Sequence, residues 1–466
     1  MLKSRLYSVF QSLSRSELRE LKKLVRSPFF NQREYVARLY DYLLECHLLL
    51  QLPPENEPAF RFLFPQQSFD HPKLRLAMSL LLKLIEKYLV YKKIFADEVR
   101  TKVELAAIYR ERKLYKQFSF TLKEAQQLQE KHTIRNAEYY NDRYRMQLEQ
   151  YLRSSAEKHT EELNLQEISD TIDLTYMALK LRQTCLLLSH QTVYKTEYEF
   201  GLLADMLSHI ESQGYLDIPA IAVYYYCYYA LTRTAEEQYF RQFKDLLLQY
   251  SQHFSQNETR DLYLMAINYC IKRLNEGNQE YFREALDLYQ GSLQQDYLLE
   301  NGTLSRFTYN NAVAIGLWLD EFEWVESFIS KYRDALEKRY RISGYSFNMA
   351  RLEYRRRHYA KALQLLSKTD YRDILLNLQV KTYQLKIYYE LKELDVLESH
   401  LDTMKTFIRR KKVIGYHQSN YLNIIRFTKK LVLHNPYDKA ERQQLKVQIA
   451  EEDILTEKAW LLNQLQ

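Results

Sequence analysis

The chain has 466 residues, which exceeds the size of one compact hydrophobic core, and it carries only 8 glycines and 8 prolines against 41 tyrosines. This composition favours helices over the tight turns of β-hairpins. The longest uncharged apolar stretch, residues 218–232, is shorter than a membrane-spanning helix, and polar residues interrupt the basic start before a signal peptide could form. We therefore expect an all-α protein of the cytoplasm with no membrane partner.

The first 95 residues form a basic N-terminal helical module. They hold six of the eight prolines and 16 lysines or arginines against 9 acidic residues, a surplus that equals the +7 net charge of the whole chain. Ser14 and Glu17 form a capping box, which predicts a helix that ends near Arg26, before Pro28. We expect the next elements to be a helix over residues 32–50, a proline-rich loop over 52–68, and a helix over 73–95 capped by Asp70.

Five cations lie along the first of these helices. Helical spacing places four of them on one edge with the fifth beside them, and we call the set the basic stripe: Arg15, Arg19, Lys22, Lys23 and Arg26. Such a stripe can neutralise the phosphates of nucleic acid or meet an acidic protein surface. It can also be a solvated face whose charges are balanced by Glu17 and Glu20. A DNA-reading helix-turn-helix is disfavoured, because the following turn is long and no glycine occurs before Gly201.

From about residue 97 onward, helices of about 12 to 20 residues alternate with short polar breaks. In one such unit, the small residue Ala350 lies on the first helix, and Tyr359 follows the turn into the second. Equivalent positions after the turn, at steps of 42, 40, 37 and 35 residues, are Phe240, Phe282, Phe322, Tyr359 and Leu394. This pattern resembles the tetratricopeptide repeat, best over residues 303–407. The resemblance implies an α-solenoid of helical hairpins over residues 96–415. Residues 416–466 should be C-terminal capping helices, one over about 416–433 and one over about 437–465.

The same resemblance implies which side chains line a binding groove. In that family, the first helices of successive hairpins face the ligand, with asparagine binding the peptide backbone and lysine or arginine binding carboxylates. The positions carried over to this chain are Asn310, Ala314, Leu317, Trp318, Phe347, Arg351, Tyr354, Arg355, Lys386 and Tyr389. A mixed polar, cationic and aromatic lining suits an extended peptide or a helix. The alternative is that these arginines and lysines only solvate the array.

Aromatic residues are densest at residues 224–229, where five tyrosines surround Cys227. Consecutive tyrosines point all round a helix, so we expect this helix to be covered on most sides. Tyrosine suits helix packing and binding grooves alike, and packing is favoured here.

No enzyme signature is present in the sequence. No two glycines lie closer than 11 residues, so neither a phosphate-binding loop nor a dinucleotide fingerprint can form, and the nearest acid–base pair, His159 and Glu162, is typical of a polar helix surface. The cysteines are at least 42 residues apart, so we expect four free buried thiols rather than a metal site. We expect no catalytic residues, no metal and no cofactor.

These observations predict a protein- or peptide-binding helical-repeat scaffold or adaptor without catalytic activity. The alternative is a nucleic-acid-associated regulator, with the basic stripe on phosphates and the solenoid as sensor or dimeriser.

Overall fold

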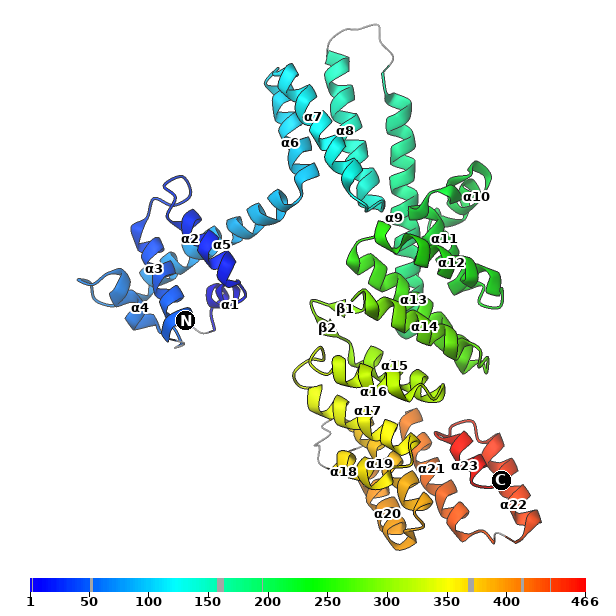
Figure 1. Ribbon diagram of the computed structural model, residues 1–466. Helices are drawn as coiled ribbons and strands as arrows, with labels where there is room; N and C mark the ends of the chain where they lie inside the picture. The colour runs from blue at the N-terminus through cyan, green and yellow to red at the C-terminus, as the bar shows by residue number, and fades with distance from the viewer. Residues whose placement is uncertain are drawn as a thin grey trace. The chain divides into compact units, whose positions relative to one another are not determined.

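The structure is a computed structural model that describes residues 1, 3–50, 53–156, 163–194, 196–367, 373–411, 415–435 and 437–466, without the side chains of residues 49, 50 and 193. The fold is all-α, as predicted (Figure 1). Within the described residues, the only strands are the two-residue pair β1, Leu299–Glu300, and β2, Thr303–Leu304, which is antiparallel. The chain divides inside a helix into two compact units, Met1–Leu179 and Lys180–Gln466, which are described separately below.

The first unit contains a basic five-helix module, followed by a helical pair and two long helices. Its helices are α1 (Arg5–Gln11), α2 (Arg15–Val25), α3 (Glu34–Leu44), α4 (Asn56–Leu63), α5 (His71–Ala96), α6 (Glu98–Glu111), α7 (Tyr115–Lys131), α8 (Ala137–Ala156) and the start of α9 (Leu165–Tyr194). Helices α1 to α5 enclose one hydrophobic core, whose fully buried members include Phe10, Leu21, Leu39 and Phe60. The predicted capping box is confirmed, because Ser14 and Glu17 bond to each other's backbone N–H groups.

One local prediction in this module is wrong, and a second is confirmed in extent but not in helix type. The proline-rich loop contains helix α4, in which Pro58 lies in the first turn, where a missing N–H costs no hydrogen bond, and Phe60 enters the core. The helix expected over residues 32–50 ends its regular part at Leu44 and continues as a π-helical segment, Glu45–Leu50. Helix α4 forms because the burial of Phe60 outweighs the local signal of the prolines.

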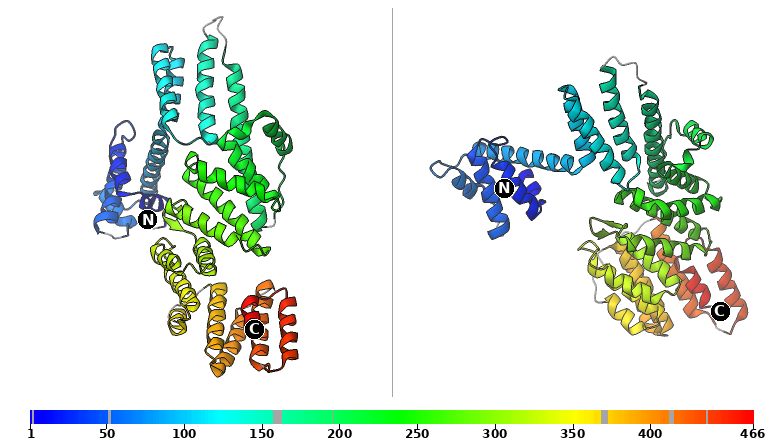
Figure 2. Two further views of the ribbon diagram at one scale, coloured as in Figure 1. Left: turned by 45° about the vertical axis from the view of Figure 1, so that its right-hand side comes forward. Right: turned by 45° about the horizontal axis from the view of Figure 1, so that its top comes forward.

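The second unit is a succession of helices that pack mainly against their neighbours in the chain (Figure 2). They are the rest of α9, α10 (Leu203–Gln213), α11 (Pro219–Thr232), α12 (Glu237–Tyr250), α13 (Gln256–Asn275), α14 (Tyr281–Gln294), α15 (Arg306–Trp318), α16 (Phe322–Lys331), α17 (Arg341–Arg355), α18 (Tyr359–Ser367), α19 (Ile374–Glu390), α20 (Leu394–Arg410), α21 (Gly415–Leu433), α22 (Lys439–Glu451) and α23 (Lys458–Asn463). Short 3-10 turns lie at Tyr215–Asp217 and Ser251–His253. The pairing of consecutive helices is consistent with a helical repeat.

Five of the helical pairs share one turn geometry. One turn residue adopts a left-handed conformation with φ between +57° and +97°: Lys113, Gly277, Asp320, Arg357 and Lys392. In every case the N–H of the next residue bonds to the carbonyl oxygen five positions earlier, as in the bond from His358 to Glu353 at 2.8 Å. This is the Schellman arrangement, which satisfies the last carbonyls of the first helix without outside help. The same short turn therefore closes the pairs α6–α7, α13–α14, α15–α16, α17–α18 and α19–α20.

Close approach within a pair depends on small residues, as the repeat pattern predicts. An ideal Cβ placed on Gly316 in α15 would lie 2.6 Å from Cγ2 of Val325 in α16 and 3.0 Å from the ring of Trp324. Ala350 and Ala362, on α17 and α18, are both buried in a common cluster. Helix α11, with its run of tyrosines, is buried on most sides, which confirms the packing interpretation.

The C-terminal segment differs from the prediction. A single helix was expected over residues 437–465, but the chain leaves α22 at Glu451, and Glu457 adopts a left-handed conformation with φ of +55° before α23 begins. Trp460 and Leu461 of α23 pack into one cluster with residues of α19 to α22. The four cysteines are buried and free, as expected. None of the described helices has the length and apolar character needed to cross a membrane.

Candidate functional site

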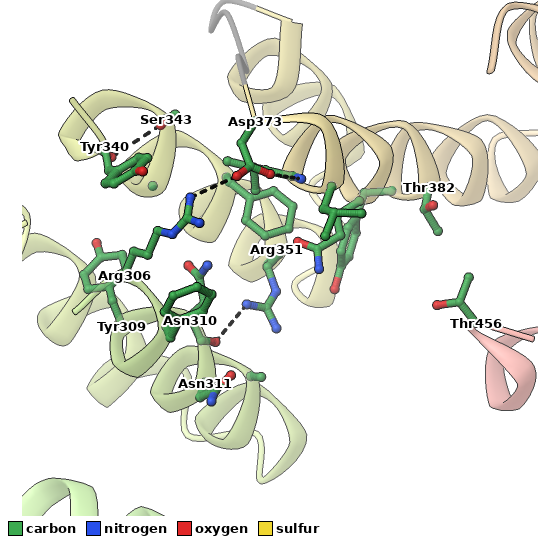
Figure 3. A pocket seen from close by; sticks show the side chains of 18 of the residues that line it. Arg306, Tyr309, Asn310, Asn311, Tyr340, Ser343, Arg351, Asp373, Thr382 and Thr456 are labelled. Carbon is green, nitrogen blue, oxygen red and sulfur yellow. Dashed lines mark hydrogen bonds and ion pairs between the residues drawn. The ribbon is translucent and has the colours of Figure 1, made fainter. Parts of the chain in front are cut away.

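Three first helices of successive pairs, α15, α17 and α19, surround a cavity of about 530 Å³ within the second unit (Figure 3). We call it the groove cavity. Four of the ten predicted groove residues line it: Asn310, Ala314, Phe347 and Arg351. Other lining residues include Arg306, Asn311, Tyr340, Asp373, Gln379, Tyr383, Tyr421, Thr456 and Glu457. The lining is thus a mixture of amides, aromatic rings and two arginines.

Arg351 is held in a network of amide groups. Its Nη1 donates to the carbonyl oxygen of Asn310, at 3.1 Å, and to Oδ1 of Asn348, at 2.9 Å. Asn348 in turn donates through Nδ2 to Oδ1 of Asn310, at 2.7 Å. Among the described residues, no carboxylate pairs with Arg351, and its buried Nε has no hydrogen-bond partner. The guanidinium therefore brings an uncompensated positive charge to the wall of the cavity.

The second arginine of the cavity is neutralised. Arg306 bonds through Nη1 to Oδ2 of Asp373, at 3.0 Å, and its guanidinium lies 4.6 Å from the ring centroid of Tyr340. Burial alone would raise the pKa of Asp373, but the backbone N–H of Leu376 and the Arg306 guanidinium outweigh it and hold that pKa below its ordinary value. Asp373 is thus ionised at neutral pH, and its charge balances that of Arg306.

Tyr354, Lys386 and Tyr389 come together, but they serve the attachment of the C-terminal segment. Lys386 is 6% exposed and pairs through Nζ with Glu457 at 2.7 Å, while its ammonium lies 4.7 Å from the ring centroid of Tyr354. The Tyr354 hydroxyl donates to Glu390, which also accepts from Nε1 of Trp460 at 2.7 Å. The resemblance implied that Lys386 binds a carboxylate of a partner, whereas here its carboxylate partner belongs to this chain.

A Tyr354 hydroxyl that donates to a carboxylate must stay protonated. Burial, followed by the hydrogen bond to Glu390, raises the pKa of Tyr354 well above its ordinary value. Tyr359 donates to the same carboxylate, and burial and Glu390 raise its pKa to about 12. Both tyrosines are therefore neutral donors at physiological pH.

Trp318 and Arg355 lie outside the lining of the groove cavity. Trp318 stacks on Phe282, with ring centroids 3.7 Å apart and an interplanar angle of 7°. Arg355 forms an ion pair with Asp320, in the turn of the preceding pair. Both contacts join one helical pair to the next.

Sequence reasoning missed Arg306, Tyr340 and Asp373. The ion pair of Arg306 and Asp373 spans 67 positions, which no local pattern reveals. The only sequence signal was the place of Asp373 directly before α19, where its side chain caps the helix.

The basic stripe lies along α2, and its cations form no ion pair with Glu17 or Glu20 of the same helix. Among its cations, Arg26 pairs with Asp41 at 2.9 Å, and the side chains of the other four make no ion pair or hydrogen bond with a described residue. Glu17 and Glu20 instead lie 3.4 and 3.5 Å from Nζ of Lys92 in α5, and Glu20 accepts from Tyr88 at 2.7 Å. Glu17 and Glu20, which the sequence offered as partners for the stripe, thus contact residues of α5 instead.

Metal-ligating side chains are scattered in the described part of the chain. No group of three or more histidine, cysteine or acidic side chains there could hold a metal ion. The pair His159 and Glu162 lies outside the described residues. Comparison with protein-family models, curated proteins and solved structures found no match. The function is therefore argued from the geometry of the chain itself.

Proposed function

We propose that the protein is a protein- or peptide-binding scaffold or adaptor of the cytoplasm without catalytic activity, built as a tetratricopeptide-like α-solenoid. Support for the repeat comes from the recurrent helical pairs with a common turn and from small residues where paired helices approach. The four free, buried thiols fit a reducing compartment.

The groove cavity is the proposed binding site, and Arg351 is the observation that carries it. An extended segment of a partner could place a carboxylate on this guanidinium, in a charge-assisted hydrogen bond, while Asn310 and Asn311 offer amides to its backbone. Asn310 and Asn348 already fix the guanidinium, so little side-chain entropy is lost on binding. Selectivity for acidic segments follows from the single unbalanced charge.

A selection from a random peptide library tests this proposal. Peptides selected on the wild-type protein should be enriched in aspartate or glutamate and should bind Arg351→Ala about 10- to 100-fold more weakly, the loss of one hydrogen bond to a charged group. Arg355→Ala is the matched control, because Arg355 lies outside the lining and pairs with Asp320. Peptides that bind both variants as well as the wild type would place the site elsewhere and overturn the proposal.

A further inference from the structure

The basic stripe and the turn that follows it suggest a second binding surface, in the first unit, that is independent of the groove cavity. Helix α2 is divided lengthwise by charge. Its acidic edge faces α5, where Glu17 and Glu20 meet Lys92, and this contact leaves the basic edge without those counter-charges. Hydrogen bonds from the Ser14 backbone N–H and side chain outweigh burial and hold the pKa of Glu17 below its ordinary value, so this carboxylate stays charged.

The turn that follows the stripe in the chain displays an aromatic pair. Phe29, three positions beyond Arg26, is 88% exposed, and Phe30 packs edge-on against it, with ring centroids 5.0 Å apart. A phenyl ring so exposed contributes nothing to the core, and its exposure to water is unfavourable.

This display is built into the turn. Asn31 donates through Nδ2 to the carbonyl oxygens of Val25, at 2.8 Å, and Arg33, at 3.1 Å, and its Oδ1 accepts from the Arg33 N–H at 3.0 Å. The N–H groups of Phe30 and Asn31 both bond to the carbonyl oxygen of Ser27. These bonds fix the backbone on both sides of Phe29, so its ring is presented without a large ordering cost.

We propose that this surface binds single-stranded nucleic acid, with backbone phosphates on the basic stripe and a base stacked on Phe29. The helical rise of about 1.5 Å per residue spreads the cations from Arg15 to Arg26 over about 16 Å, which suits a chain of phosphates better than one compact anion. An aromatic platform beside a cationic track is the arrangement that binds unpaired bases without regard to sequence. Bases in a duplex are already stacked on both faces, and so cannot use an exposed phenyl ring.

Fluorescence anisotropy with the full-length protein tests this assignment. The probes are labelled oligothymidylate and oligouridylate of about 16 nucleotides and a mixed-sequence duplex of the same length, titrated at about 50 and 200 mM salt. We expect single strands to bind more tightly than the duplex, with affinity that falls as salt rises, by a slope of about −0.7 per phosphate contact in logarithmic units.

Two variants separate charge from stacking. The double substitution Arg19→Glu with Lys22→Glu should lower single-strand affinity at least about 10-fold and flatten the salt dependence. Phe29→Ala should lower it about 5- to 150-fold and leave the salt slope unchanged, since it removes only stacking. All of these residues are exposed or half-buried and outside the hydrophobic core, and circular dichroism verifies that the variants are folded.

Controls come from the same chain. Arg61→Glu changes an exposed arginine of the same module outside the stripe, and Arg351→Ala changes the groove cavity; neither should alter oligonucleotide binding. The proposal is overturned if no oligonucleotide binds at low salt, if the duplex binds as tightly as the single strands, or if binding survives both the charge reversal and Phe29→Ala. Binding to vesicles rich in acidic phospholipid, with none to oligonucleotides, would also overturn it.

Discussion

Two sets of cations, one in the helical pairs around α17 and one on α2, have different roles. A run of basic residues in the sequence does not show its role until the partners of its side chains are known. Around α17, Arg356 pairs with Glu326 at 2.8 Å, Lys361 with Glu353 at 2.7 Å, and Lys386 with Glu457 at 2.7 Å. On α2, four of the five stripe cations have no such partner among the described residues. The first set joins helices to one another, whereas the second is free to meet a ligand.

Arg351 lies in the helical pairs around α17, but like the stripe cations on α2 it has no carboxylate partner among the described residues. Amides hold its guanidinium, but no carboxylate of the described chain balances it. Cations with a carboxylate partner in the chain therefore stabilise the fold, whatever their place in the sequence. We assign ligand binding to the cations without such a partner.

The strongest way to break this comparison is to remove Glu353, which is 0% exposed and accepts from Lys361 Nζ at 2.7 Å and from His358 at 2.8 Å. Glu353→Ala should lower the free energy of local opening in α17 and α18 by about 1.5–3 kcal/mol, because it removes a buried acceptor of hydrogen bonds from charged groups. Native-state hydrogen exchange of these helices measures the change.

Lys22→Ala on the basic stripe is the matched control for Glu353→Ala. Since Lys22 has no partner among the described residues, hydrogen exchange in α2 and α3 should change by less than about 0.5 kcal/mol. Equal costs at both sites would show that the stripe also contributes to folding, and the comparison would fail.

A second test concerns the close packing of the array rather than its charges. Gly316→Ala should destabilise α15 and α16 by about 1–3 kcal/mol, because the added methyl group would overlap Val325 and Trp324. Gly291 in α14 has no atom within 4 Å of an added Cβ, so Gly291→Ala should stabilise its helix by about 0.5–1 kcal/mol. Urea denaturation of both variants measures the difference, and the same sign for both would contradict the packing argument.

The smallest expected effect is a dependence on pH. Burial would raise the pKa of Glu353, but hydrogen bonds from Lys361 and His358 outweigh it and lower that pKa from its ordinary value of 4.5. A depressed carboxyl pKa stabilises the folded state above the unfolded value, and this contribution is lost as the pH falls below about 4.5. Hydrogen-exchange protection of α17 and α18 should therefore decline as the pH falls from about 5 to about 3, measured against pH-corrected intrinsic rates. In Glu353→Gln the decline should be weaker, and an unchanged decline would assign it to other groups.

Local signals in the sequence were sufficient where local interactions decide the structure. The capping box of Ser14 and Glu17, the cap at Asp70 and the small residue Ala350 each act within a few positions or one helical pair, and each was predicted. The all-α fold followed from the composition in the same way.

The rest depended on contacts between distant positions. Helix α4 forms in a proline-rich segment because Phe60 is buried by helices that the segment itself does not specify. The register of the repeat placed Asn310, Phe347 and Arg351 in the cavity, but it could not show that Glu457 would take Lys386 or that Asp373 would neutralise Arg306. Such pairings are set by tertiary structure, and their partners lie about 70 positions apart.

The turn shared by five helical pairs gives the chain a natural unit of growth. Each turn completes its own backbone hydrogen bonds, so a pair carries everything needed to reverse direction. The turn residues Asp320 and Arg357 are 37 positions apart, and an in-frame duplication of that length would add a whole pair with its turn intact. A duplication of 35 residues, the spacing of Arg357 and Lys392, would do the same, whereas a length that matches no such spacing would break the phase between turns and helices. A change in the length of the array by whole pairs would therefore leave every remaining turn with its own hydrogen bonds.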